Sequence, residues 1–127
     1  MADKQCIQVP SIKTIGPYSQ AVRAGGLLFV AGQPGVNPAT GEAAGPTFEL
    51  QARQAFKNLD VVLRAGGSNL SLVVSTTVLV TDMANFPEVN RLFAEFFGDN
   101  PPARMAVQTP LPKQLLFSMG CVAAVED

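Results

Sequence analysis

The chain has 127 residues and a formal net charge of −1, with 47% of its residues hydrophobic and only 15% charged. This length predicts a single domain over residues 1–127, and a charged share well below the usual value of about 25% favours an oligomer that covers part of the surface. The absence of histidine excludes Ser/His/Asp and Cys/His nucleophile systems and argues against a metal site, while the balanced charge without a basic cluster argues against nucleic-acid binding.

Residues 19–33 are expected to form a β-hairpin. Two strand-like segments, 20–23 and 27–31, flank Gly25-Gly26, and this glycine pair can adopt the positive φ angles of a two-residue turn. The next segment, 35–46, is rich in Gly, Pro, Asn and Thr, which predicts a loop.

A helix is predicted over residues 47–65. Thr47 is suited to cap its N-terminus, and Gly66-Gly67 to end it. The opposite side carries two i,i+4 ion pairs of the ordinary solvated kind, Glu49 with Arg53 and Asp60 with Arg64. The apolar residues at helical spacing are expected to face the core: Leu50, Ala55, Leu59, Val62 and Leu63.

The second half of the chain predicts a strand, a second helix and two more strands. Residues 72–80 are β-branched and apolar, as in a buried strand. The second helix is expected to begin with Asn85 as its cap, with Glu88 three residues later as in a capping box, and to end at Phe97.

The last two strands are predicted over residues 103–108 and 115–125, which completes the order β-β-α-β-α-β-β. This order indicates an α+β fold in which two helices cover one face of a mixed sheet. Both faces of the last strand are apolar or small, so the face without helices requires another cover, and a second subunit would supply it. One face holds Leu116, Ser118, Gly120 and Val122, and the other Leu115, Phe117, Met119, Cys121 and Ala123.

Arg104 is the one charged residue of the otherwise apolar segment 101–107. A guanidinium keeps its proton at ordinary pH, and its unpaired burial is very unfavourable. Arg104 must therefore reach solvent, pair with an acidic residue (including one of a neighbouring subunit), or bind an anionic ligand. The third alternative would make the chain a binder of small carboxylates.

Five groups of residues occur in a characteristic order: Ile15–Ala21; Phe29–Gln33; Thr76–Val78 with Thr81–Met83; Val89-Asn90 with Phe96-Phe97; and Pro101–Arg104. In this order and spacing they resemble the RidA/YjgF family of reactive-intermediate (imine and enamine) deaminases, some of whose members carry the label endoribonuclease L-PSP. The resemblance extends from about residue 12 to about residue 123.

The resemblance implies a chorismate-mutase-like fold and a homotrimer whose ligand pockets lie between subunits. It also implies hydrolysis of 2-imino acids, released as enamines, to 2-oxo acids and ammonia, without a cofactor and without a metal. Arg104 would bind the substrate carboxylate, since a planar two-pronged guanidinium suits a planar carboxylate. Tyr18 would line the pocket and offer its hydroxyl, Asn90 matches a pocket asparagine, and backbone groups of Ala31, Gly32 and Ala106 would face the reacting carbon and the water.

Five positions depart from the family pattern. Ala31 stands where deaminating members have a serine, and Met105-Ala106 where Ser-Cys or Ser-Thr is common. In the last strand, Ser118 and Gly120 replace two glutamates, the first of which is the usual candidate for activating the water. A neutral serine can orient a water but is a poor general base. We therefore expect a more apolar pocket, roomier at Gly120, with an altered substrate range and slow hydrolysis of the standard small imines.

Three function classes remain after these observations. The first is an imine or enamine deaminase in which Arg104, Tyr18 and Ser118 act on the substrate, with a narrower or bulkier substrate set than usual as one alternative. A catabolic variant that deaminates unsaturated amino-dicarboxylates also belongs to this class. The second is a non-catalytic module that binds small carboxylates or keto acids, which the replacement by Ser118 favours. The third is a ribonuclease, which the charge and the lack of histidine disfavour. For Tyr18, Asn90 and Ser118 the alternative roles are packing, helix-surface bonding and filling of a tight strand.

The sequence also predicts a cytoplasmic protein. No apolar run approaches the roughly 20 residues of a membrane span, and no basic stretch followed by an apolar segment indicates a signal peptide. The low cysteine content fits a reducing compartment, and Cys121 is expected to be a free thiol in a buried strand.

Overall fold

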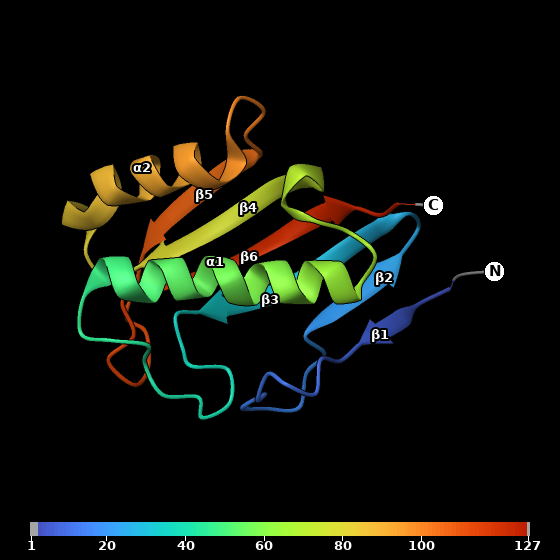
Figure 1. Ribbon diagram of the computed structural model, residues 1–127, viewed down its shortest axis with the longest axis horizontal. Helices are drawn as coiled ribbons and strands as arrows, with labels where there is room; N and C mark the ends of the chain where they lie inside the picture. Colours follow the sequence, from blue (N-terminus) through green and yellow to red (C-terminus); the bar gives the residue numbers. More distant parts are fainter. Residues whose placement is uncertain (1–2, 127) are drawn as a thin grey trace.

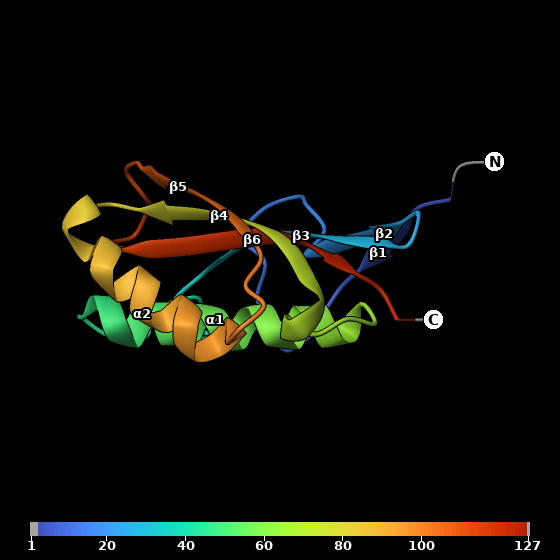
Figure 2. The same ribbon diagram turned by 90° about the horizontal axis from the view of Figure 1, so that it is seen from above.

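The computed structural model describes residues 3–126. Both helices pack on the same face of a six-stranded sheet, as Figures 1 and 2 show from two directions. The elements are β1 (Gln5–Ile7), β2 (Ala21–Ala24), β3 (Leu27–Pro34), α1 (Phe48–Ala65), β4 (Val73–Val80), α2 (Phe86–Phe97), β5 (Ala103–Gln108) and β6 (Phe117–Ala124), with short 3₁₀ helices η1 (Leu70–Leu72) and η2 (Met83–Asn85).

The sheet is mixed, in the order β1-β2-β3-β6-β4-β5. Only β4 and β5 pair in parallel, because α2 crosses between them and returns the chain to its starting end. All other neighbours are antiparallel. The predicted α+β architecture, with two helices on one face of a mixed sheet, is therefore confirmed.

The core fills the space between the sheet and the helices, and Phe56 lies at its centre. Its ring stacks on Phe96 of α2 with centroids 4.4 Å apart, and it meets Phe93 edge to face at 5.9 Å. On its other side it approaches Phe117 of β6 at 6.3 Å. These rings fix α2 against both α1 and the sheet, which sets the position of the surface that α2 presents to β5.

Several local predictions are confirmed. The Thr47 hydroxyl accepts a hydrogen bond from the Leu50 amide at 3.2 Å, so Thr47 caps α1. The last strand alternates as expected, since Phe117, Met119, Cys121 and Ala123 are buried beneath the helices and the residues between them are half-buried. Burial raises the pKa of the free Cys121 thiol to about 12, so it is inert at neutral pH.

Other local predictions are wrong. Leu50 is 51% exposed, because it lies on the opposite side of α1 from Phe48 and Ala52, which are buried. Asn85 makes no side-chain cap, since η2 runs directly into α2; instead Asp82 accepts from the Ala84 amide at 2.9 Å and caps η2. β6 starts at Phe117 rather than residue 115, and β1 is an additional edge strand.

The sheet face opposite the helices, here called the open face, is not covered by any helix or strand of residues 3–126. Within the described residues of β3 to β6 its side chains are uncharged, and Phe29, Met105 and Val107 are 46%, 63% and 40% exposed. Figure 2 shows that no helix lies on this side. We define the open face by Phe29, Ser75, Thr77, Leu79, Met105, Val107, Ser118, Gly120 and Val122.

Candidate functional site

Arg104 lies on the helix side of β5 and stacks on α2. Its guanidinium carbon is 4.9 Å from the ring centroid of Phe86 and 4.8 Å from that of Phe93. Asn90 lies between these two positions on the helix and lines the same pocket as Arg104, together with Pro102. Residues at i, i+4 and i+7 share one face of a helix, so α2 presents a ring, an amide and a second ring to the arginine.

The guanidinium of Arg104 has no anionic partner among the residues that the structure describes. Within residues 3–126 it forms no ion pair and no hydrogen bond, although it is solvent-exposed. Stacking occupies the faces of the guanidinium and leaves the N–H donors at its edge available. Pairing with an acid of the same chain is therefore excluded for the described residues. An arginine that is solvated, paired with an acid of another subunit, or bound to a ligand remains.

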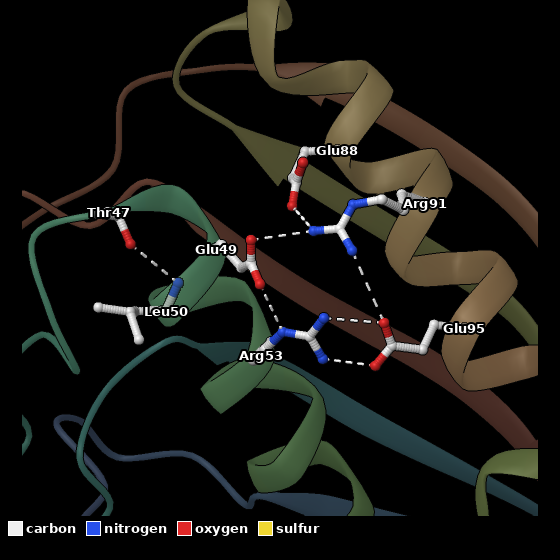
Figure 3. Close-up of polar contacts among 7 residues, drawn as sticks. All are labelled: Thr47, Glu49, Leu50, Arg53, Glu88, Arg91 and Glu95. Atoms are coloured by element: carbon white, nitrogen blue, oxygen red, sulfur yellow. Dashed lines mark hydrogen bonds and ion pairs between the residues drawn. The ribbon is translucent and has the colours of Figure 1, made fainter.

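The charges on the solvent side of α1 and α2 form a closed cluster of five residues, here called the helix charge cluster (Figure 3). Arg53 bonds Glu49 at 3.0 Å and both carboxylate oxygens of Glu95 at 2.6 and 2.9 Å. Arg91 contacts Glu49 at 3.1 Å and pairs with Glu88. Hydrogen bonds from Arg53 lower the pKa of Glu49 and of Glu95.

The predicted pair of Glu49 with Arg53 is thus confirmed and extends to the second helix. The predicted pair of Asp60 with Arg64 is also present, with the Arg64 Nε 3.0 Å from a carboxylate oxygen. These charges satisfy one another in solvent, so they fit the ordinary interpretation of a solvated helix face.

Tyr18 lines a different pocket from the one that Arg104 lines. It is 47% exposed and lines a cavity that Gly32 also lines. The buried Gln20 makes two bonds in this region: its side-chain amide donates to the Ile12 carbonyl at 2.8 Å, and its backbone carbonyl accepts from the Ala31 amide at 2.9 Å. The backbone of Gln20 thereby ties the end of the loop that carries Tyr18 to the strand that carries Gly32.

Ala31 and Gly32 lie at an irregularity of β3, where the register with β6 shifts between Val30 and Gln33. Such a bulge turns backbone groups out of the ladder. A Cβ atom on Gly32 would lie 3.0 Å from the Ser118 hydroxyl oxygen, so Ser118 lies against this bulge. Gly120 lines a shallow hollow of the open face, where a Cβ would lie 3.1 Å from the Val30 carbonyl oxygen.

The sequence-predicted site residues therefore fall into two groups in one chain. Arg104 and Asn90 share the pocket between α2 and β5, whereas Tyr18 and Gly32 share the cavity beside β3. β6 and β4 separate β3 from β5 in the sheet. Ser118 projects from the open face and Arg104 from the helix face.

Ala106 is on the same side of β5 as Arg104, and its methyl group packs against the core, which leaves only its backbone groups for ligand contact. Sequence reasoning missed the stacking roles of Phe86 and Phe93. Their spacing of seven residues around Asn90 was a signal for a shared helix face.

Within residues 3–126, no three or more Cys, Asp or Glu side chains gather as a metal site would require. None of the helices described here has the length and apolarity to cross a membrane.

Comparison with known proteins finds similarity over nearly the whole chain. A family model described as endoribonuclease L-PSP matches residues 9–125. A RutC family protein of Pyrococcus horikoshii is 43% identical over 115 residues, which cover 90% of this chain and 91% of the relative. The human 2-iminobutanoate/2-iminopropanoate deaminase is 39% identical over 110 residues, 86% of this chain and 80% of the relative. Among solved structures, E. coli TdcF with bound serine has a TM-score of 0.87 at 30% identity, covering 96% of this chain and 99% of that chain.

Proposed function

Because this chain belongs to the RidA/YjgF family, whose model is described as endoribonuclease L-PSP and which includes imine deaminases, we propose that it hydrolyses 2-imino acids to 2-oxo acids and ammonia. The observation that carries the proposal is Arg104, a cation that stacks on two rings and pairs with no acidic side chain of the described residues. A ligand carboxylate would pair with this guanidinium and accept two parallel charge-assisted hydrogen bonds from it. That serine is bound in the structure of E. coli TdcF supports a ligand of this class.

The complete site is proposed to form between subunits of a homotrimer. Arg104 and Asn90 of one copy would meet Tyr18, Gly32 and Ser118 of the next, because one chain holds the two groups apart. The uncharged open face supports this assembly, since its exposed apolar side chains require a cover.

The proposed reaction needs water and no cofactor. Water adds to C2 of the imine, forming a C–O bond while the imine nitrogen takes a proton, and the resulting carbinolamine expels ammonia to leave the C2 carbonyl. Arg104 would hold the C1 carboxylate, Tyr18 would orient the substrate with its ring and hydroxyl, and Ser118 would hold the water by its hydroxyl. Backbone groups of Ala31, Gly32 and Ala106 would border the reacting carbon. Positioning alone accelerates a reaction of this kind, because imines hydrolyse readily.

The substrate range is proposed to differ from that of glutamate-containing members. Ser118 carries no charge near the proposed water position, and Ala31 supplies no hydroxyl at the bulge. The site therefore has few groups able to take a proton from water, and we expect slow turnover of 2-iminopropanoate and 2-iminobutanoate.

A second candidate function is non-catalytic binding of small carboxylates or keto acids. The combination of a retained Arg104 with an uncharged Ser118 favours it. We do not propose ribonuclease activity, because the chain has a net charge of −1 and no histidine, and phosphate neutralisation supplies most nucleic-acid affinity.

A coupled imine assay separates the two candidates. An amino-acid oxidase generates 2-imino acids in the presence of semicarbazide, and hydrolysis is measured as the loss of semicarbazone. Hydrolysis by the native protein that Arg104→Ala abolishes would establish the deaminase. A native protein that is silent on imines of several sizes, while Ser118→Glu gains activity, would instead support the binding module.

A further inference from the structure

The cavity beside β3 combines an apolar interior with two lysines. Ile12, Val36 and Leu115 are buried side chains that line it, whereas Lys13 and Lys113 line it from solvent-exposed positions. Lysine stems pack along apolar surface while their ammonium groups stay at the edge, so the cavity has an apolar wall and a cationic rim.

No acidic side chain compensates this cationic rim in the described part of the chain. The residues that line the cavity include no aspartate or glutamate. Within residues 3–126, neither Lys13 nor Lys113 takes part in an ion pair. Two ammonium groups at one cavity repel each other, and an anion between them would relieve the repulsion.

The backbone that carries Lys113 is held in an unusual conformation. Lys113 and Gln114 have φ angles of 56° and 58°, and they are the non-glycine residues of positive φ among the described residues. The Leu115 amide closes the turn by donating to the Pro112 carbonyl at 3.0 Å. Strained backbone of this kind persists where its surroundings impose it and often marks ligand-binding segments. Here it places Lys113 on the rim.

The cavity is continuous with the proposed active site, since Tyr18 and Gly32 also line it. We propose that it is a subsite for the far end of the substrate, and that this end is an anionic group on a short apolar chain. The preferred substrates are then 2-imino acids with a second carboxylate, held by Arg104 at C1 and by Lys13 and Lys113 at the other end. This inference rests on the proposed function and names its substrate class.

Binding of two stable product analogues to the intact protein tests the subsite. 2-Oxoadipate and 2-oxohexanoate have the same chain length and differ in a terminal carboxylate or methyl group. By isothermal titration calorimetry, we expect 2-oxoadipate to bind about tenfold more tightly, as two partly exposed charge pairs would give. Lys113→Met should reduce this preference to about threefold or less and leave 2-oxohexanoate affinity unchanged, because it removes one of the two pairs and keeps a linear side chain.

Lys57→Met is the matched control, because Lys57 is an exposed lysine of α1 outside the cavity, and it should keep the full preference. Equal affinities for the two analogues in the native protein would overturn the subsite, as would a Lys113→Met variant that weakens both analogues in proportion. If Arg104→Ala abolishes 2-oxohexanoate binding in those cases, the proposed function stands without the subsite. If the native protein binds neither analogue, or Arg104→Ala changes nothing, both proposals fail.

Discussion

Helix α2 contacts an arginine on each of two sides, and the two arginines have opposite surroundings. On the side toward α1, Arg53 bonds both oxygens of Glu95 and one of Glu49, and its guanidinium is 6.0 Å from the ring centroid of Phe96. On the side toward β5, Arg104 stacks on two rings and has no carboxylate among the described residues. The first arrangement is complete within the chain. Arg104 is the same kind of cation, but no carboxylate pairs with it. A ligand is therefore expected on the β5 side of α2.

The largest expected effect is that of Arg104→Ala on catalysis. Loss of a two-pronged carboxylate contact should lower kcat/KM for 2-imino acids by about 10²- to 10³-fold. The melting temperature should fall by only a few degrees, because two cation–π contacts are lost but no ion pair or hydrogen bond of the described residues. Arg104→Lys serves as the control. It keeps the positive charge but cannot donate two parallel hydrogen bonds to one carboxylate, so it should recover only part of the activity. An unchanged kcat/KM in Arg104→Ala would contradict the proposed binding of the substrate carboxylate by Arg104.

The stacking rings should have a smaller effect through the same arginine. Phe86→Leu keeps apolar volume but removes one aromatic face, and a cation–π contact at a partly exposed site contributes about 0.5–1 kcal/mol. We expect kcat/KM to fall about two- to fivefold, mainly through KM, because the guanidinium loses part of its orientation. Steady-state kinetics measure this change. Leu92→Ile, a conservative substitution in the buried core of the same helix, should leave KM unaltered.

Substitutions in the helix charge cluster should change stability and leave catalysis unchanged. Glu95→Gln removes the two-pronged partner of Arg53 and should lower the melting temperature slightly at low ionic strength. The difference from the native protein should disappear in about 1 M salt, where exposed charges are screened. Thermal melts at both salt concentrations, with imine hydrolysis measured in parallel, test this; a loss of hydrolysis would show that the cluster also supports the site.

The smallest expected effect is a pH dependence of stability from the same cluster. The folded pKa values of Glu49 and Glu95 are lowered below 4.5, so these carboxylates bind fewer protons in the folded than in the unfolded state near that pH. Their contribution is therefore fully present above the unfolded pKa and is lost as the pH falls through the lowered folded pKa. Urea midpoints measured from pH 7 to pH 3 should fall less steeply for Glu49→Gln than for the native protein. If the urea midpoints of the two proteins fell equally with pH, Glu49 would not contribute to the pH dependence of stability.

Sequence patterns were most informative where a local rule agreed with the global packing. The helical spacing of Ala55, Leu59 and Val62 predicted the buried side of α1, and the period-two pattern of residues 117–123 predicted which residues of β6 share a face. Where a second element intervened, the local rule was wrong. The capping signal at Asn85 was overridden because η2 precedes α2 without a break.

The sequence could identify the individual site residues but not their relative positions in space. Motif resemblance singled out Arg104, Tyr18 and Ser118, yet pairwise spacing in a sequence does not show which strands become neighbours. The chain places β6 and β4 between the two groups, which separates residues that the family pattern treats as one site. The rings beneath Arg104 were missed because apolar residues on a helix are most often core residues.

The position of β6 in the sheet has a consequence for the order of folding. β6 is the last element along the chain, yet it lies between β3 and β4 and pairs with both, as Leu27 with Ala124 and Val80 with Phe117. During synthesis, β3 and β4 therefore emerge from the ribosome without their common neighbour, and α1 and α2 have no finished surface to pack on. Sheets that depend on such distant pairings form slowly. Until β6 is made, β3 and β4 each lack a partner along one edge, and chaperone protection of these apolar edges matters most during this interval.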